Sequence, residues 1–260
     1  MDIWTLLAVT LGTALTMMIL LWLYSLAKKD ASIVDSFWGP GFALIGWVSL
    51  FWTKGFQPRK FLIVALVTIW GLRLGIHIFT RNHGKGEDYR YKAMRKQYGD
   101  KFPLVSLFTV FGFQGLLMWF ISVPLQIAQV SPAPDRLTLF DYLGAAVWAV
   151  GFLFEAIGDW QLKQFKAEPK NKGKVMDKGL WRYTRHPNYF GDATLWWGYY
   201  LIACAVPYGF WTALSPLTMT IFLMNVSGVS LLEKSLKKNK PGYAKYIART
   251  SSFFPMPPKS

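Results

Sequence analysis

Long apolar blocks alternate with short polar stretches along most of this chain. A helix needs about 20 consecutive apolar residues to cross the hydrocarbon core of a membrane, and several blocks approach or reach that length. The pattern therefore predicts an all-α fold, a polytopic bundle of about seven transmembrane helices. The second and sixth spans are the shortest. The expected spans are Trp4–Leu26, Phe37–Trp52, Phe61–Phe79, Val105–Ala128, Leu139–Trp160, Gly191–Val206 and Gly209–Leu232.

The chain carries no sign of a second domain or of a removed leader. The first block lacks a basic start and ends in Lys28 and Lys29, which favours a retained helix over a signal peptide. No Ser- or Gly-rich linker or internal repeat divides the sequence, so we expect one integral-membrane domain over residues 1–260. The single cysteine, Cys204, permits no intrachain disulfide.

Basic residues gather between the apolar blocks and give a net charge of +15. With seven spans, nearly all of these clusters fall on one side of the membrane. The other side receives only Lys54, Arg59, Lys60 and Arg136. The positive-inside rule then places the amino terminus outside and the carboxyl terminus in the cytoplasm, in a bacterial inner membrane or an equivalent one. The charge thus indicates membrane topology and not nucleic-acid binding.

Charged side chains also fall inside the predicted spans. Arg73 lies within the third span, where an arginine costs about 2.5–3.5 kcal/mol on insertion scales. His77 and Arg81 follow on the same helical face, where a polar cavity or an anionic ligand would offset the cost, although both could instead snorkel to the interface. Glu155 and Asp159 repeat the four-residue spacing in the fifth span, either for a ligand or for an interhelical salt bridge.

Two loops and the start of the second span carry the remaining candidate chemistry. The loop that follows Arg81 contains cations, acids and tyrosines, which could bind a phosphate group and stack on an adenine-like ring. A solvated loop that binds no ligand would have the same composition. Asp35 begins the second span and could be a helix N-cap. The segment Gly179–Asp192 places cations, an imidazole, an amide and a carboxylate before an apolar helix, whose free N–H groups attract anions. Three histidines without ligand spacing argue against a metal site.

The motifs in these segments resemble the steroid 5-alpha-reductase superfamily, and more narrowly its uncharacterised DUF1295 branch. The resemblance extends from about Asp35 to the carboxyl terminus. The motifs are Trp70-Gly71-Leu72-Arg73-Leu74, Gly86-Glu87-Asp88, Arg90-Tyr91, the whole segment Gly179–Asp192, and the closing Lys240-Pro241-Gly242-Tyr243, Tyr246, Arg249-Thr250 and Phe254-Pro255.

The resemblance implies a seven-helix membrane enzyme that binds NADPH in a cytoplasm-facing cavity and reduces a carbon–carbon double bond in a lipid or steroid-like molecule. Asp159 would contact the adenosine half, Asn188 the nicotinamide, and Asp192 would replace a family glutamate. The expected catalytic residues are Asp35, Asn188 and Asp192. The expected cofactor-binding residues are Arg73, His77, Arg81, Asp88, Arg90, Tyr91, Arg95, Asp159, Lys166, Tyr183, Arg185, His186, Asn188 and Tyr189.

Two departures leave alternatives open. Reductases of 3-oxo steroids use a Gln-Glu pair and a helical tyrosine, where this chain has Asp35-Ser36 and Trp70, and an indole donates no catalytic proton. The Arg-His-Pro-x-Tyr-x-Gly string also occurs in S-adenosylmethionine-dependent methyltransferases that resemble isoprenylcysteine carboxyl methyltransferase. Those usually carry paired glutamates after the last span, and this chain has Leu231-Leu232-Glu233. A non-enzymatic lipid-binding protein is the third hypothesis.

Overall fold

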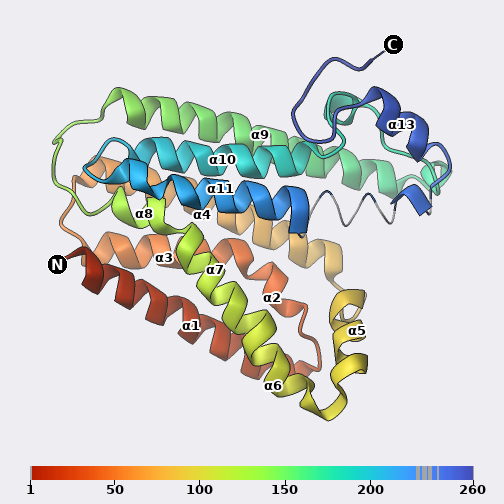
Figure 1. The fold of residues 1–260 in the computed structure, drawn as a ribbon, viewed down its shortest axis with the longest axis horizontal. Coiled ribbons are helices and arrows are strands. Elements are labelled where there is room, and N and C mark those ends of the chain that lie inside the picture. The colour runs from red at the N-terminus through yellow and green to blue at the C-terminus, as the bar shows by residue number, and fades with distance from the viewer. Residues whose placement is uncertain (1, 227–228, 230–232, 234–235, 239, 260) are drawn as a thin grey trace. The chain divides into compact units, whose positions relative to one another are not determined.

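The computed structural model describes residues 2–226, 229, 233, 236–238 and 240–259 (Figure 1). The predicted last span, Gly209–Leu232, ends in residues that are mostly outside the described ones. These include Leu231 and Leu232 of the Leu231-Leu232-Glu233 motif. Within the described ranges, all the named elements are helical, so the protein is all-α, as predicted. Thr184 and Ser251 form an isolated parallel bridge.

Within the part of the chain that the structure describes, five helical stretches are long and apolar enough to cross a membrane. The helical run of the predicted fourth span begins earlier than that span, with the charged stretch at Tyr89, and it breaks at Ser122, before the predicted end at Ala128. The two shortest predicted spans form helices of 15 and 17 residues, α3 (Trp38–Trp52) and α10 (Pro187–Ala203). The count of seven and the orientation of the termini therefore stay predictions. The five stretches are Ile3–Lys28, Gln57–Asn82, Tyr89–Ile121, Leu139–Ala167 and Gly209–Val226.

The chain forms two compact units, described separately below. The first comprises Met1–Thr138 with Ala203–Gly209, and the second comprises Leu139–Ile202 with Phe210–Ser260. The expectation of one domain stays a prediction.

In the first unit, α3 packs closely against α4 (Gln57–Asn82) because glycine faces glycine. A Cβ atom on Gly71 would lie 2.4 Å from the carbonyl oxygen of Gly39, so neither position has room for a side chain. The other helices of this unit are α1 (Ile3–Lys28), α2 (Ile33–Ser36), α5 (Tyr89–Tyr98), α6 (Phe102–Ser106), α7 (Phe113–Ile121) and α8 (Val123–Ile127). The turns η1 (Gly99–Lys101) and η2 (Leu107–Gly112) join α5, α6 and α7.

In the second unit, α9 (Leu139–Ala167) lies alongside α10 (Figure 1). Glycines at seven-residue intervals on α9, Gly144, Gly151 and Gly158, all face α10. A Cβ atom on Gly151 would lie 2.4 Å from the backbone nitrogen of Leu195, so the two backbones touch. The remaining elements are η3 (Pro169–Asn171), η4 (Gly179–Arg182), η5 (Gly209–Ala213, which begins in the first unit), α11 (Leu214–Ile221), η6 (Phe222–Val226) and α13 (Tyr243–Arg249).

Candidate functional site

The segment Gly179–Asp192 is tied to the end of α9. The indole Nε1 of Trp181 donates to the carbonyl oxygen of Gly158 at 3.1 Å, and the backbone N–H of Leu180 donates to Gln161 Oε1 at 3.0 Å. Pro187 then occupies the first position of α10, where its fixed φ suits a helix start and its missing N–H costs no bond. The segment therefore brings Asn188, in the first turn of α10, beside the last turns of α9.

Asp159 and Asn188 form a direct pair in this unit. Asn188 Nδ2 donates to Asp159 Oδ1 at 3.0 Å, and the Asp159 side chain is buried. Because a carboxylate accepts hydrogen bonds, this contact fixes which end of the amide is the donor. The other end, the buried carbonyl oxygen Oδ1 of Asn188, has no hydrogen-bond partner within the described ranges of the chain. The amide thus presents a buried acceptor whose donor does not lie among the described residues.

A buried ion cluster of Arg185, His186 and Glu233 follows in the same segment. Arg185 Nε lies 2.7 Å from Glu233 Oε1, and His186 Nε2 lies 3.3 Å from the same oxygen. Burial alone would raise the pKa of the Glu233 carboxyl, but hydrogen bonds from His186 and Arg185 outweigh it and hold the pKa at about 2. The His186 ring stacks on that of Tyr189, with centroids 5.6 Å apart. Glu233 is therefore an ionised anchor for both basic side chains.

The carboxyl-terminal tail covers the same segment. The backbone N–H of Arg185 donates to Ser251 O at 2.9 Å, Thr184 Oγ1 donates to Phe253 O at 2.8 Å, and Met256 N donates to Tyr183 O at 2.9 Å. The hydroxyl of Tyr246 donates to the Trp181 carbonyl, and the Arg185 guanidinium donates to the carbonyl oxygens of residues 247 and 250. The closing motif of the sequence is thus the partner of the Gly179–Asp192 segment. Glu233, Thr184 and Tyr246 were missing from the predicted site residues, although each lies in a segment that the sequence analysis had singled out: Leu231-Leu232-Glu233, Gly179–Asp192 and the closing motif.

A second polar cluster lies in the first unit, around Asp35. The Asp35 carboxylate accepts from Arg90 Nη2 at 2.6 Å and from the Tyr91 hydroxyl at 2.7 Å. Burial raises the pKa of the Asp35 carboxyl above its ordinary value, and the charge of Arg90 and the hydroxyl of Tyr91 act in the opposite direction. The N-cap alternative for Asp35 is wrong, since Asp35 lies inside α2 and Phe37 precedes α3.

The loop residues beside Asp35 are also paired. Asp88 is the N-cap of α5, where its carboxylate accepts from the backbone N–H and from Nε of Arg90, both at 2.9 Å. Arg95 binds Glu87 through two hydrogen bonds of 2.7 and 3.0 Å. Glu87 in turn accepts from the backbone N–H of Ala31 at 2.9 Å, which ties the loop to the start of α2. Each arginine predicted to bind phosphate in this loop therefore already pairs with a carboxylate.

The remaining predicted residues occupy separate positions. Arg73 and His77 are half-buried on α4, and Arg81 is exposed near its end, where its Nε donates to Asn82 Oδ1 at 3.2 Å. Asp192 is buried on α10, one turn after Asn188. Lys166 and Tyr183 are exposed. Of the predicted residues, the structure thus brings together two groups. Asp35, Asp88, Arg90 and Tyr91 form an Asp35 cluster in the first unit, and Asp159 and Asn188 form an Asn188 cluster in the second unit.

Comparisons with known proteins agree with the motifs. The model of the family described as "Protein of unknown function (DUF1295)" matches residues 21–250. A protein of Schizosaccharomyces pombe (strain 972) that is named Uncharacterized protein C594.04c is 27% identical over 266 residues, which covers 90% of this chain and 75% of the relative. No solved structure is significantly similar to the chain.

Proposed function

This chain belongs to the DUF1295 family, the steroid 5-alpha-reductase-like branch, and from that membership we propose that it is an NADPH-dependent membrane reductase of a carbon–carbon double bond. Its substrate would be a lipid or steroid-like molecule that reaches the protein from the membrane. The observation that carries the proposal is the Asp159–Asn188 pair, in which Asp159 fixes the amide and leaves its carbonyl oxygen as a buried acceptor.

The residues of the Asn188 cluster fit a nicotinamide cofactor. A nicotinamide carries a carboxamide, whose N–H groups would satisfy the buried Asn188 Oδ1, and an unsatisfied buried acceptor otherwise costs about 1–3 kcal/mol. The resemblance implies Asn188 at the nicotinamide and Asp159 at the adenosine half, but their side chains are hydrogen-bonded at 3.0 Å, so we propose that both lie at the nicotinamide end. The bound cofactor would supply the hydride for the reduction. Asn188 and Asp159 would hold the cofactor in one orientation, which fixes the distance to the reacting carbon.

Proton transfer to the neighbouring carbon is the second half of the reaction. Asp192, one helical turn after Asn188 in the same unit, is the proposed acid, and a nearby water is the alternative; Asp35 stays a predicted catalytic residue of the first unit. Burial raises the pKa of the Asp35 carboxyl, which is the direction that a proton donor requires. The hydroxyl of Tyr91 at 2.7 Å and the guanidinium of Arg90 would orient that carboxyl.

A membrane methyltransferase that uses S-adenosylmethionine is the second candidate. The observation that favours it is the contact of Glu233 with both Arg185 and His186, since the methyltransferases that share the Arg-His-Pro string carry glutamates at this place. This chain has a single glutamate where those methyltransferases usually have a pair, so we rank the methyltransferase second. The third candidate, a non-enzymatic lipid-binding protein, predicts that neither ligand binds.

A binding titration of the full chain in detergent micelles separates the three candidates. NADPH and S-adenosylmethionine would each be added to the purified protein while heat is measured. We expect saturable binding of NADPH, and no binding of S-adenosylmethionine. Binding of S-adenosylmethionine alone would replace the reductase by the methyltransferase. Absence of binding by both, in protein whose thermal unfolding is cooperative, would support the lipid-binding protein.

A further inference from the structure

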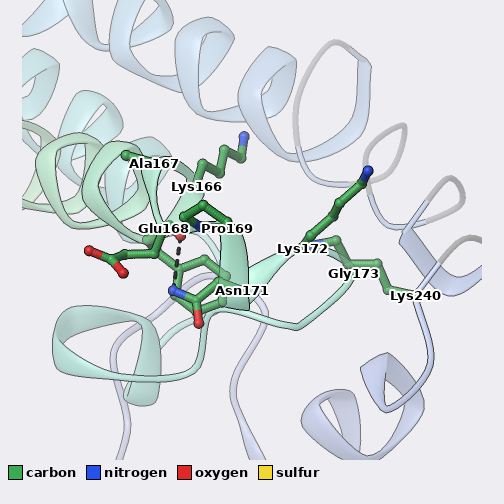
Figure 2. Close-up of a pocket in the computed structure, with 9 residues that line it drawn as sticks. Lys166, Ala167, Glu168, Pro169, Asn171, Lys172, Gly173 and Lys240 are labelled. Carbon is green, nitrogen blue, oxygen red and sulfur yellow. Dashed lines mark hydrogen bonds between the residues drawn. The ribbon is translucent and has the colours of Figure 1, made fainter.

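A pocket opens where α9 ends, and neither Asn188 nor Glu233 lines it (Figure 2). Its volume is about 330 Å³, at the lower end of the range for small-molecule sites. Figure 2 shows that its walls come from the last turn of α9, the loop that follows and the segment before α13. The lining residues are Phe165, Lys166, Ala167, Glu168, Pro169, Asn171, Lys172, Gly173 and Lys240.

The polar lining of this pocket is mainly basic. Lys166, Lys172 and Lys240 line it from three different segments, and Glu168 is its one acidic lining residue. Glu168 lies 3.3 Å from Lys170, so part of its charge is already neutralised. The surrounding stretch is basic as well, with seven lysines and arginines against two acids between residues 163 and 182. The pocket therefore has a positive potential that attracts an anion.

The loop around the pocket is held in place by hydrogen bonds. Asn171 Nδ2 donates to the Phe165 carbonyl at 3.0 Å and so satisfies one of the free carbonyl groups at the end of α9. The backbone N–H of Lys172 donates to Pro169 O at 3.1 Å, which fixes the turn that carries Lys172. Lys240 Nζ donates to Lys174 O at 2.6 Å, and burial lowers the pKa of this ammonium group.

The helix dipole explains only part of this arrangement. A lysine in the last turn of a helix is favoured by the negative end of the dipole, and this accounts for Lys166. It does not account for Lys172 or Lys240, which lie outside α9 and line the same pocket. Cations brought together from separate segments around a preformed cavity are the arrangement that binds a phosphate group.

We propose that this pocket binds the phosphate of an anionic membrane lipid headgroup. A soluble phosphate has the same chemistry, but the position of the pocket favours the lipid. Its wall begins with Phe165 to Ala167, the last residues of a helix long and apolar enough to cross the membrane. The apolar span of that helix was predicted to end at Trp160, so residues 165–167 would lie in the headgroup layer, where basic pockets between helices bind anionic lipids. The proposal does not depend on the reductase proposal.

The experiment uses the full chain in detergent and native mass spectrometry. Phosphatidylglycerol and phosphatidylcholine would be titrated separately into wild-type protein and into the double variant Lys172→Gln/Lys240→Gln. Each lysine near a headgroup is worth about 1 kcal/mol, or about fivefold, so we expect phosphatidylglycerol affinity to fall by roughly tenfold or more in the double variant. Lys166 stays unchanged, because the reductase proposal assigns it to the cofactor.

A matched control removes the same charge outside the pocket. Lys237→Gln/Lys238→Gln changes two exposed lysines close in sequence that do not line the cavity, and we expect affinity to fall less than about twofold. Equal losses in both double variants would overturn the site. Equal affinity for the two lipids, or saturable binding of pyrophosphate that displaces phosphatidylglycerol, would overturn the lipid assignment.

Since Lys240 also holds the loop, its substitution could act through folding. The single variant Lys172→Gln avoids this, because it leaves the bond from Lys240 to the loop carbonyl intact. We expect about fivefold weaker phosphatidylglycerol binding with an unchanged melting temperature, and recovery in Lys172→Arg. Unchanged lipid affinity in Lys172→Gln would contradict the proposal.

Discussion

The contact of α9 with α10 gives a sharp prediction at Gly151. In Gly151→Ala the added Cβ would lie 2.4 Å from Leu195 N and 2.6 Å from Gly191 O, and both of these are backbone atoms that cannot rotate away. The helices must therefore move apart. Overpacking of this kind costs about 1–3 kcal/mol. Because the clash is with backbone atoms, we take the upper part of this range, about 2–3 kcal/mol; the higher helix propensity of alanine returns about 1 kcal/mol, so we expect a net loss of about 1–2 kcal/mol.

Two other glycines calibrate the effect. Gly158→Ala meets its nearest atom, Asn188 N, at 3.2 Å, so a shift of a few tenths of an ångström suffices and the loss should be smaller. Gly12→Ala on α1 has no atom within 4 Å and should be neutral or slightly stabilising. The expected order of stability is therefore Gly12→Ala, then Gly158→Ala, then Gly151→Ala.

Thermal unfolding of the purified variants measures this order. A thiol-reactive dye would report exposure of Cys204, the single cysteine in the sequence, as each protein unfolds. At about 2–4 °C per kcal/mol for a chain near this size, Gly151→Ala should melt roughly 2–8 °C below the wild type. A Gly151→Ala protein as stable as Gly12→Ala would refute the close approach of the two backbones.

Three further predictions concern the polar clusters. Glu233→Gln should lower the melting temperature at pH 7. Because the folded pKa of Glu233 is about 2 and its ordinary value is 4.5, the difference from wild type should shrink below about pH 4.5, and a pH-independent difference would count against the ion cluster. Asp35→Asn weakens the ion pair with Arg90, and a hydrogen bond to a charged group is worth about 1.5–3 kcal/mol. Amide hydrogen exchange in α5 should therefore become roughly tenfold faster. The control Asp100→Asn changes an exposed residue and should have no effect. Thr184→Val removes a buried hydrogen bond to the tail, worth about 1 kcal/mol, and should make residues 250–259 more sensitive to protease; unchanged cleavage would contradict the docking of the tail.

The sequence predicted the helices better than their ends. The predicted span Phe61–Phe79 lies inside α4. The helix itself runs from Gln57 to Asn82, because polar residues at its ends also adopt helical geometry. The fourth predicted span likewise covers only part of its helical run, since the charged Tyr89–Tyr98 stretch before it is helical too. The glycines of α9 were a readable signal for close packing, but their partner helix depends on the tertiary fold.

The candidate site was predicted in its residue types and not in its pairings. Asp35 and Arg90 lie 55 residues apart in the sequence, and no local pattern indicates that they meet. The predicted phosphate-binding arginines were selected for their charge, and their carboxylate partners became visible only with the fold. By contrast, Asp159 and Asn188 were both predicted, and the structure places them 3.0 Å apart.

The central claim is that Asn188 Oδ1 accepts a hydrogen bond from the carboxamide of a nicotinamide. The direct measurement compares the affinity of NADPH with that of its acetylpyridine analogue, which has no carboxamide N–H, in wild-type protein and in Asn188→Ala. With a bond worth about 1 kcal/mol, the wild type should bind the analogue roughly fivefold more weakly than NADPH, and Asn188→Ala should not distinguish the two. Equal affinities in the wild type, or the same preference in both proteins, would contradict the account.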